Sequence, residues 1–304
     1  MKPTPEEAVW APGPWRHRDI AANGVRFHAA EMGNGPLVLL LHGFPQFWWT
    51  WRSLLPALAE AGYHAVAVDL RGYGGSDHTP HGYDPFTLSA DAAGIVRSLG
   101  ESDAVLVGHG WGGLIAWSAA VLRRPAVRAI APVSMPHPNM LRKGIVSDPE
   151  QRRLSRYALG FQMPFTPERR LLRDDAAEVA QFLHNWSGSP QWPDPATADT
   201  YRAAMCFGAT AHCALEYHRW AIRSIPRPDG RRFAERMRER VTQPVLQIVG
   251  REDGALLPRT FDGSESFVAG RYERHDLAGV GHFPQEEVPG QFNELLLRWL
   301  ESLD

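Results

Sequence analysis

Short apolar runs alternate with helix-length segments in the first half of the chain. Strands are predicted at residues 17–20, 25–31, 37–42, 64–69, 104–108 and 127–133, and helices at 49–60, 87–99 and 112–123. The runs LVLLLHG and AVLVGHG are apolar without alternation, which is typical of central parallel strands that are covered on both faces. This strand–helix repeat predicts an α/β fold with a mostly parallel central sheet and helices on both faces.

The pattern changes in the middle of the chain. From about residue 138 to 235 the strand signal disappears, and the segment is helical in tendency, rich in Arg and Trp and broken by Pro-containing turns. Strands return at 245–250 and 272–277, and an amphipathic helix follows at 289–303. We therefore predict a core in two parts, residues 1–137 and 236–304, with an inserted helical cap at 138–235.

Charge and composition restrict the possible partners. The 304 residues include 32 Lys plus Arg against 34 Asp plus Glu, and the formal net charge is −2. No global field would draw such a chain to nucleic acid or to an anionic membrane. With 44% hydrophobic residues the chain can build a large core, and we expect a small lipophilic molecule as its partner and a monomer or homodimer in solution.

Cysteines and histidines point to neither a disulfide framework nor a metal site. The two cysteines, Cys206 and Cys213, are too few for either, and a reducing, cytoplasmic setting fits them best. The 13 histidines show no paired ligand spacing, and no phosphate loop is present, so we expect no metal and no cofactor. Residues 1–15 lack a long apolar run and are expected to be neither a signal peptide nor a membrane anchor.

Two segments carry candidate chemistry at the ends of predicted strands. HGFP, at residues 42–45, is a tight turn that can aim backbone N–H groups into a pocket. VLVGHGWGGLIAW reads as strand, turn and helix, with small residues on both sides of a central position at which a nucleophile is commonly presented. That central residue is Gly110, which has no side chain to attack a substrate. The Gly-rich DLRGYGGSD at 69–77 is expected to shape the fold only.

An acid and a base follow the vacant nucleophile position in the chain. Asp253 comes after the strand at 245–250, with Glu252 beside it, and His282 comes after the strand at 272–277 and before the last helix. The order of nucleophile position, acid and histidine is that of a hydrolase triad. A His held by a carboxylate can act as a general base.

From about residue 14 to 303 these motifs resemble the epoxide-hydrolase branch of the α/β-hydrolases, in which Asp stands at the position of Gly110. The resemblance implies the α/β-hydrolase fold and an oxyanion hole built by the backbone N–H groups of Phe44 and Trp111. It also implies two cap tyrosines that donate hydrogen bonds to an epoxide oxygen. Tyr157, four residues before FQMP, and Tyr217, within LEYHRW, match these tyrosines.

The missing nucleophile leaves several functions open. His282, oriented by Asp253, would activate water directly, with Tyr157 and Tyr217 polarising the epoxide. The same pair would alternatively drive a base-catalysed reaction unrelated to epoxides, or the protein would be a pseudoenzyme that binds a ligand on this fold. The last alternative is that Gly110 is an engineered replacement of Asp in an active epoxide hydrolase. We favour a hydrolase of the epoxide-hydrolase type.

Overall fold

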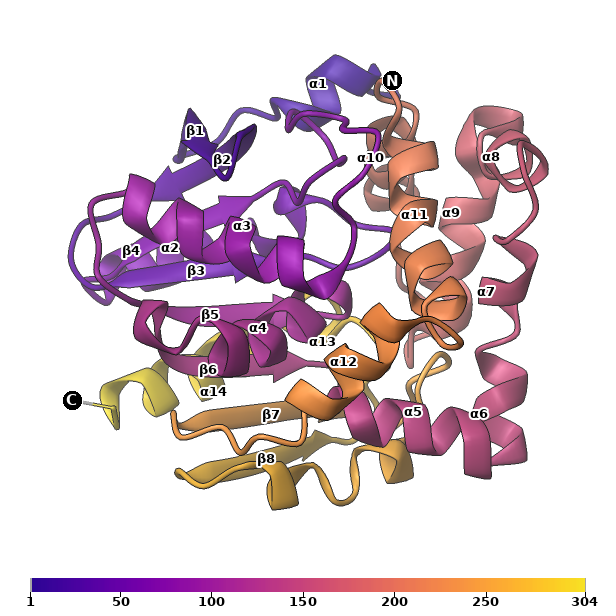
Figure 1. Cartoon of the computed structure of the whole chain (residues 1–304). Helices are drawn as coiled ribbons and strands as arrows, with labels where there is room; N and C mark the ends of the chain where they lie inside the picture. Colours follow the sequence, from indigo (N-terminus) through magenta and orange to yellow (C-terminus); the bar gives the residue numbers. More distant parts are fainter. Residues whose placement is uncertain (1, 304) are drawn as a thin grey trace.

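The computed structural model describes residues 2–303, and its centre is an eight-stranded sheet (Figure 1). The strands are β1 (Arg16–Ala22), β2 (Val25–Met32), β3 (Leu37–Leu41), β4 (His64–Val68), β5 (Ala104–His109), β6 (Val127–Val133), β7 (Val245–Gly250) and β8 (Tyr272–Leu277). Their order across the sheet is β1-β2-β4-β3-β5-β6-β7-β8. Only the pairs β1–β2 and β2–β4 of this sheet are antiparallel, which confirms the mostly parallel sheet.

Helices cover both faces of this sheet. The core helices are α1 (Pro5–Val9), α2 (Leu54–Glu60), α3 (Pro85–Ser98), α4 (Trp111–Leu122), α13 (Pro284–Glu287) and α14 (Pro289–Glu301), and the 3₁₀ turns are η1 (Trp48–Trp51), η2 (Arg124–Ala126), η3 (Pro258–Phe261) and η4 (Ser264–Phe267). α3 packs against α4, and α2 packs against α14. Every residue of β3 and β5 between these layers is buried, as the unbroken apolar runs predicted.

One predicted helix is divided in the structure. The segment predicted as a single helix at 49–60 is the 3₁₀ turn η1 followed by α2, which begins at Leu54. Pro56 explains the break, because a continuous helix would place this residue in its interior, where it lacks the N–H for an i→i−4 hydrogen bond. Starting the helix at Leu54 puts Pro56 in the first turn, where no such bond is needed.

The segment between β6 and β7, called the cap below, contains helices only. They are α5 (Pro138–Ser147), α6 (Pro149–Leu154), α7 (Tyr157–Gly160), α8 (Thr166–Leu171), α9 (Arg173–Trp186), α10 (Pro195–Met205), α11 (Thr210–Arg223) and α12 (Pro228–Arg236). Figure 1 shows them gathered on one side of the sheet, beside the ends to which β5 and β6 point. This helical insertion agrees with the predicted boundaries 138–235 to within one residue, and its status as a separate domain stays a prediction.

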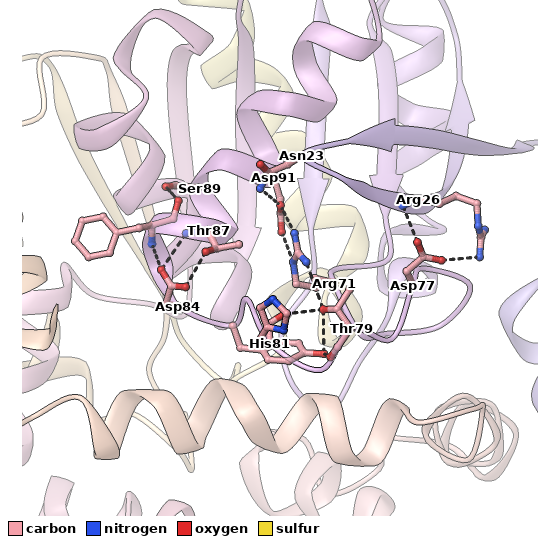
Figure 2. A network of polar contacts seen from close by, with 12 residues as sticks. Asn23, Arg26, Arg71, Asp77, Thr79, His81, Asp84, Thr87, Ser89 and Asp91 are labelled. Atoms are coloured by element: carbon pink, nitrogen blue, oxygen red, sulfur yellow. Dashed lines mark hydrogen bonds and ion pairs between the residues drawn. The ribbon is translucent and has the colours of Figure 1, made fainter. Parts of the chain in front are cut away.

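The loop that follows β4 is tied to α3 by a buried ion pair. Arg71 donates from Nε and Nη2 to the two carboxylate oxygens of Asp91 at 2.7 and 2.6 Å, and Asn23 donates to the same carboxylate at 2.6 Å (Figure 2). Both charges are almost fully buried, and this two-pronged geometry satisfies them with direct hydrogen bonds. The loop therefore presents the backbone carbonyl of Arg71 at a fixed place under the cap.

Candidate active site

The turn between β5 and α4 has the geometry of a nucleophile turn with no side chain at its tip. Gly110 sits at φ +51° and ψ −115°, directly before the first residue of α4. A Cβ on Gly112 would stand 2.0 Å from the carbonyl oxygen of Leu41, so only glycine allows the helix to approach β3 this closely. The N–H of Gly112 donates to the carbonyl of His42 at 3.0 Å and fixes the approach.

Asp253 and His282 form a buried hydrogen-bonded pair beside this turn. Nδ1 of His282 lies 2.7 Å from Oδ2 of Asp253, and Oδ1 of Asp253 accepts the backbone N–H groups of Ala255 and Leu256 at 2.7 and 2.9 Å. Because the carboxylate only accepts, Nδ1 carries the imidazole proton and Nε2 is left with a lone pair. Nε2 lies 3.7 Å from the point where a Cβ of residue 110 would stand. The lone pair therefore faces the space above Gly110.

The neighbouring acid, Glu252, has a different task. One of its carboxylate oxygens accepts the backbone N–H of Val280 at 3.1 Å, within the loop that leads to His282. Its carboxylate therefore supports the loop, and of the two acids it is Asp253 that bonds to the imidazole of His282.

The loop that carries His282 is held from both the core and the cap. The backbone N–H of His282 donates to the carbonyl of Trp186 in α9 at 2.8 Å, and its carbonyl lies 2.8 Å from Nε2 of His109. The carboxylate of Glu287 accepts three backbone N–H groups, those of Gly188, Gly281 and Phe283. These bonds couple the position of the imidazole to the docking of the cap.

A cavity of about 350 Å³ lies between the sheet and the cap. Core residues that line it include Phe44, Gly110, Trp111, Leu114, Met135 and His282, and cap residues include Leu141, Tyr157, Trp186, His218, Ile222 and Ile225. The lining is apolar except for a few polar groups. His218 and His282 are buried like Gly110, and Tyr157 packs against the ring of His218, so these groups mark the inner end of the cavity. A small lipophilic molecule fits such a space.

The structure brings one of the two predicted tyrosines into the cavity. Tyr157 lines it, and its hydroxyl has no hydrogen-bond partner among residues 2–303. Burial and the charge of Asp253 raise its pKa, so the hydroxyl stays protonated and can donate. Tyr217 is absent from the lining, and its hydroxyl donates to the carbonyl of Arg71 at 2.7 Å. In this structure Tyr217 therefore makes a structural contact between α11 and the core, and its assignment as a donor to the substrate stays a prediction.

His218 occupies the place expected for Tyr217. Adjacent helix residues are about 100° apart, so only one of the two can face the cavity, and in α11 it is His218. Trp111 donates its indole N–H to Nε2 of His218 at 3.2 Å, and burial lowers the pKa of His218 to about 4. His218 was not predicted as a site residue, although residues 218, 221 and 222 of α11 are spaced with the helical period and all line the cavity.

Phe44 and Trp111, the predicted oxyanion residues, both line the cavity. Within residues 2–303 neither of their backbone N–H groups has an acceptor. Trp111 is also the first residue of α4, where backbone N–H groups have no partner inside the helix and favour negative charge. Both groups are free to donate to a substrate oxygen, and their joint action stays a prediction.

Two further observations concern cofactors and membranes. Residues 2–303 contain no group of three or more His, Cys, Asp or Glu side chains placed to hold a metal ion. Over the same residues, no helix has both the length and the apolar character needed to cross a bilayer.

Comparison with known proteins places these features in context. Residues 38–295 match the model of the alpha/beta hydrolase family. An epoxide hydrolase of Caballeronia sordidicola is 34% identical over 94% of both chains, and epoxide hydrolase A of Mycobacterium tuberculosis is 30% identical over 94% of this chain and 98% of its own. The solved structure of an epoxide hydrolase from an endophytic Streptomyces superposes with a TM-score of 0.82 at 31% identity, covering 96% of this chain and 97% of the other.

Proposed function

The chain belongs to the α/β-hydrolase family and is of the epoxide-hydrolase-like type, and from this we propose that it hydrolyses small lipophilic epoxides with water activated directly by His282. One observation carries the proposal. Nε2 of His282, whose Nδ1 is bonded to Asp253, faces the space above Gly110 at the inner end of an apolar cavity.

The chemistry follows from the polar groups at that end of the cavity. His282 takes a proton from water at Nε2 while the water oxygen forms a bond to an epoxide carbon and the ring C–O bond breaks. The alkoxide so formed takes the phenolic proton of Tyr157, because an alkoxide is the stronger base. The proton on His282 returns to the phenolate through water, and the net reaction adds one water to the epoxide.

Gly110 determines both the route and its speed. In the ordinary reaction of this branch a carboxylate at this position attacks the epoxide and forms an ester, and Gly110 supplies none. Loss of the nucleophile costs a comparable hydrolase on the order of a millionfold in turnover, with about a thousandfold over water left from the rest of the site. We therefore expect slow turnover that depends on the imidazole.

The missing nucleophile also favours a second candidate, a ligand-binding protein without turnover. On that alternative the cavity would hold a lipophilic molecule, and the Asp253–His282 pair would contribute only to the structure. Binding proteins and enzymes share this fold, so the two functions differ in turnover. A measurement of turnover can decide.

The test is hydrolysis of a panel of lipophilic epoxides by the protein and by His282→Ala. We expect slow diol formation that the substitution abolishes, with an unchanged circular dichroism spectrum. A single turnover in ¹⁸O-labelled water should place the label in the first diol formed, since direct attack draws its oxygen from solvent. Turnover that survives His282→Ala would refute the proposal, and saturable binding of the epoxides without turnover would establish the binding function in its place.

A further inference from the structure

Large apolar side chains are exposed on one part of the cap. Five are more than half exposed: Val146 (67%), Leu159 (59%), Met163 (59%), Phe165 (74%) and Ile225 (57%). Elsewhere in residues 2–303 the only other exposed large apolar side chains are Trp10 and Leu172, at 42% and 41%. We call the five residues the rim patch. All five belong to the cap, and exposed apolar side chains gathered on one region of a protein mark an interaction surface.

Two members of the rim patch line the cavity, and the other three lie on neighbouring segments. Leu159 and Ile225 line the cavity although they are exposed, so the cavity reaches the surface beside them. Val146 joins the same region, since its carbonyl accepts a hydrogen bond from Arg152, another lining residue. Met163 and Phe165 continue the chain beyond Leu159, in the connection from α7 to α8. Figure 1 shows α6, α7 and α8 in a row along the outer edge of the cap.

Arginines with no acidic partner lie on the same part of the cap as the rim patch. Exposed arginines that have no carboxylate within ion-pair distance in the part of the chain that the structure describes include Arg152, Arg153, Arg156, Arg169 and Arg227. Three acids of the same region are already paired, Glu150 with Arg259, Glu168 with Arg219 and Glu178 with Arg170. The net charge of −2 for the whole chain therefore conceals a local excess of positive charge.

We propose that the rim patch docks the protein onto the surface of an anionic phospholipid bilayer. Apolar side chains that project among guanidinium groups suit the boundary between acyl chains and anionic headgroups. The cavity opens within this surface, so a lipophilic molecule dissolved in the bilayer can enter it without crossing water. Docking is a property of the cap surface and does not depend on the chemistry at His282.

The test is cosedimentation of the full chain with vesicles of phosphatidylcholine, with and without added phosphatidylglycerol. We expect association with the anionic vesicles only, weakened by salt. Each arginine near such a surface contributes about fivefold to binding, so Arg153→Glu with Arg169→Glu should weaken it by more than about tenfold. Replacing Met163 and Phe165 by Ser should weaken it about tenfold. None of these four residues lines the cavity.

Matched controls lie outside the segments that carry the rim patch. Trp10→Ser removes an exposed apolar side chain from the N-terminal segment, and Arg97→Glu reverses an exposed charge in α3. Both should bind anionic vesicles like the parent. No association with anionic vesicles, or equal losses in the control and patch variants, overturns the proposal. A concentration-dependent dimer in sedimentation velocity that the Phe165→Ser change dissolves would also overturn it, because the rim patch would then bind a second copy of the chain.

Discussion

Trp111 donates its indole N–H to Nε2 of His218 across 3.2 Å, and Nδ1 of the same imidazole lies 3.2 Å from the carbonyl of Ala214. Since a carbonyl only accepts, Nδ1 carries the proton and Nε2 supplies the lone pair. His218 is therefore held in one neutral tautomer. A second proton would have to be placed on Nε2, directly against the indole N–H.

We predict that acid destabilises the fold through two buried imidazoles. Burial lowers the pKa of His42 and of His218 to about 4, against about 6.5 in an unfolded chain. Because the folded pKa is the lower one, the unfolded state takes up protons first. The stabilisation is complete above about pH 6.5 and is lost as the pH falls toward 4. At pH 5 the loss is about 2 kcal/mol per imidazole.

Urea denaturation of the protein at pH 7.5 and at pH 5 measures this effect. His218→Gln keeps an acceptor for the indole of Trp111 but does not titrate in this range. Its free energy of unfolding should therefore change less between the two pH values, by about 2 kcal/mol. If the free energy of unfolding depends on pH equally in the parent and the variant, protonation of His218 does not contribute to the acid destabilisation, and the prediction is wrong.

The two cap tyrosines should respond oppositely to the same substitution. Tyr157→Phe removes a hydroxyl without a protein partner and should change stability by less than about 0.5 kcal/mol, while epoxide turnover falls at least about tenfold. Tyr217→Phe leaves the carbonyl of Arg71 without its donor and should cost about 1–3 kcal/mol of stability, with a smaller effect on turnover. Denaturation and initial rates on both variants test this contrast, and a reversed pattern restores Tyr217 to the substrate site.

The fold and the Asp253–His282 pair could be predicted from the sequence because strong local patterns specify them. The unbroken apolar runs of β3 and β5 are possible only for strands covered on both faces, and the Gly residues around Gly110 are required by the close approach of α4 to β3. Asp253 and His282 were found because each follows a strand whose end lies at the same edge of the sheet. Each of these patterns is formed by residues that are close together in the sequence.

The cap residues that line the cavity were harder to predict, because the position of a residue around the helix axis decides which way its side chain points. A motif places Tyr217 and His218 equally well, and a one-residue difference turns a side chain by about 100°. Only the spacing of residues 218, 221 and 222 along α11 distinguishes the face that lines the cavity. The break between η1 and α2 was missed for a related reason, since a periodic pattern continues through Pro56 while the hydrogen bonds do not.

Glu287 should matter for stability far more than its place near a helix end suggests. Its two oxygens accept backbone N–H groups from Gly188 in the cap and from Gly281 and Phe283 beside His282. Glu287→Gln replaces one acceptor oxygen by a donor and should lower the free energy of unfolding by about 1–3 kcal/mol. Glu294→Gln, which breaks an exposed pair with Arg298, is the matched control and should cost less than about 0.5 kcal/mol. Equal thermal shifts in the two variants would contradict the prediction.

Gly110 can accept a side chain, at a cost that its backbone sets. A Cβ at this position would meet the Cα of Gly43 at 3.6 Å and Nε2 of His282 at 3.7 Å, both ordinary contact distances. The positive φ of +51° is strained for any other residue, and we predict that Gly110→Ala and Gly110→Asp each lose about 1–3 kcal/mol of stability. Chemical denaturation checks this, and unchanged stability in Gly110→Ala would show that the turn carries no strain.

Gly110→Asp should also install a nucleophile within reach of a ready base. The new carboxylate would stand beside Nε2 of His282, at the inner end of the cavity that Tyr157 also lines. We expect epoxide turnover to rise at least about a hundredfold over the parent, whereas Gly110→Ala, with the same backbone strain, gains nothing. Attack needs only the carboxylate and hydrolysis of the ester needs the base, so Gly110→Asp combined with His282→Ala should accumulate a covalent ester that mass spectrometry detects.

The source of the oxygen in the diol separates the direct-water route from the ester route, because the first turnover of Gly110→Asp in ¹⁸O-labelled water should release unlabelled diol. A folded Gly110→Asp protein that neither turns over nor traps any epoxide would show that the cavity no longer positions epoxides, and the binding function would then be favoured.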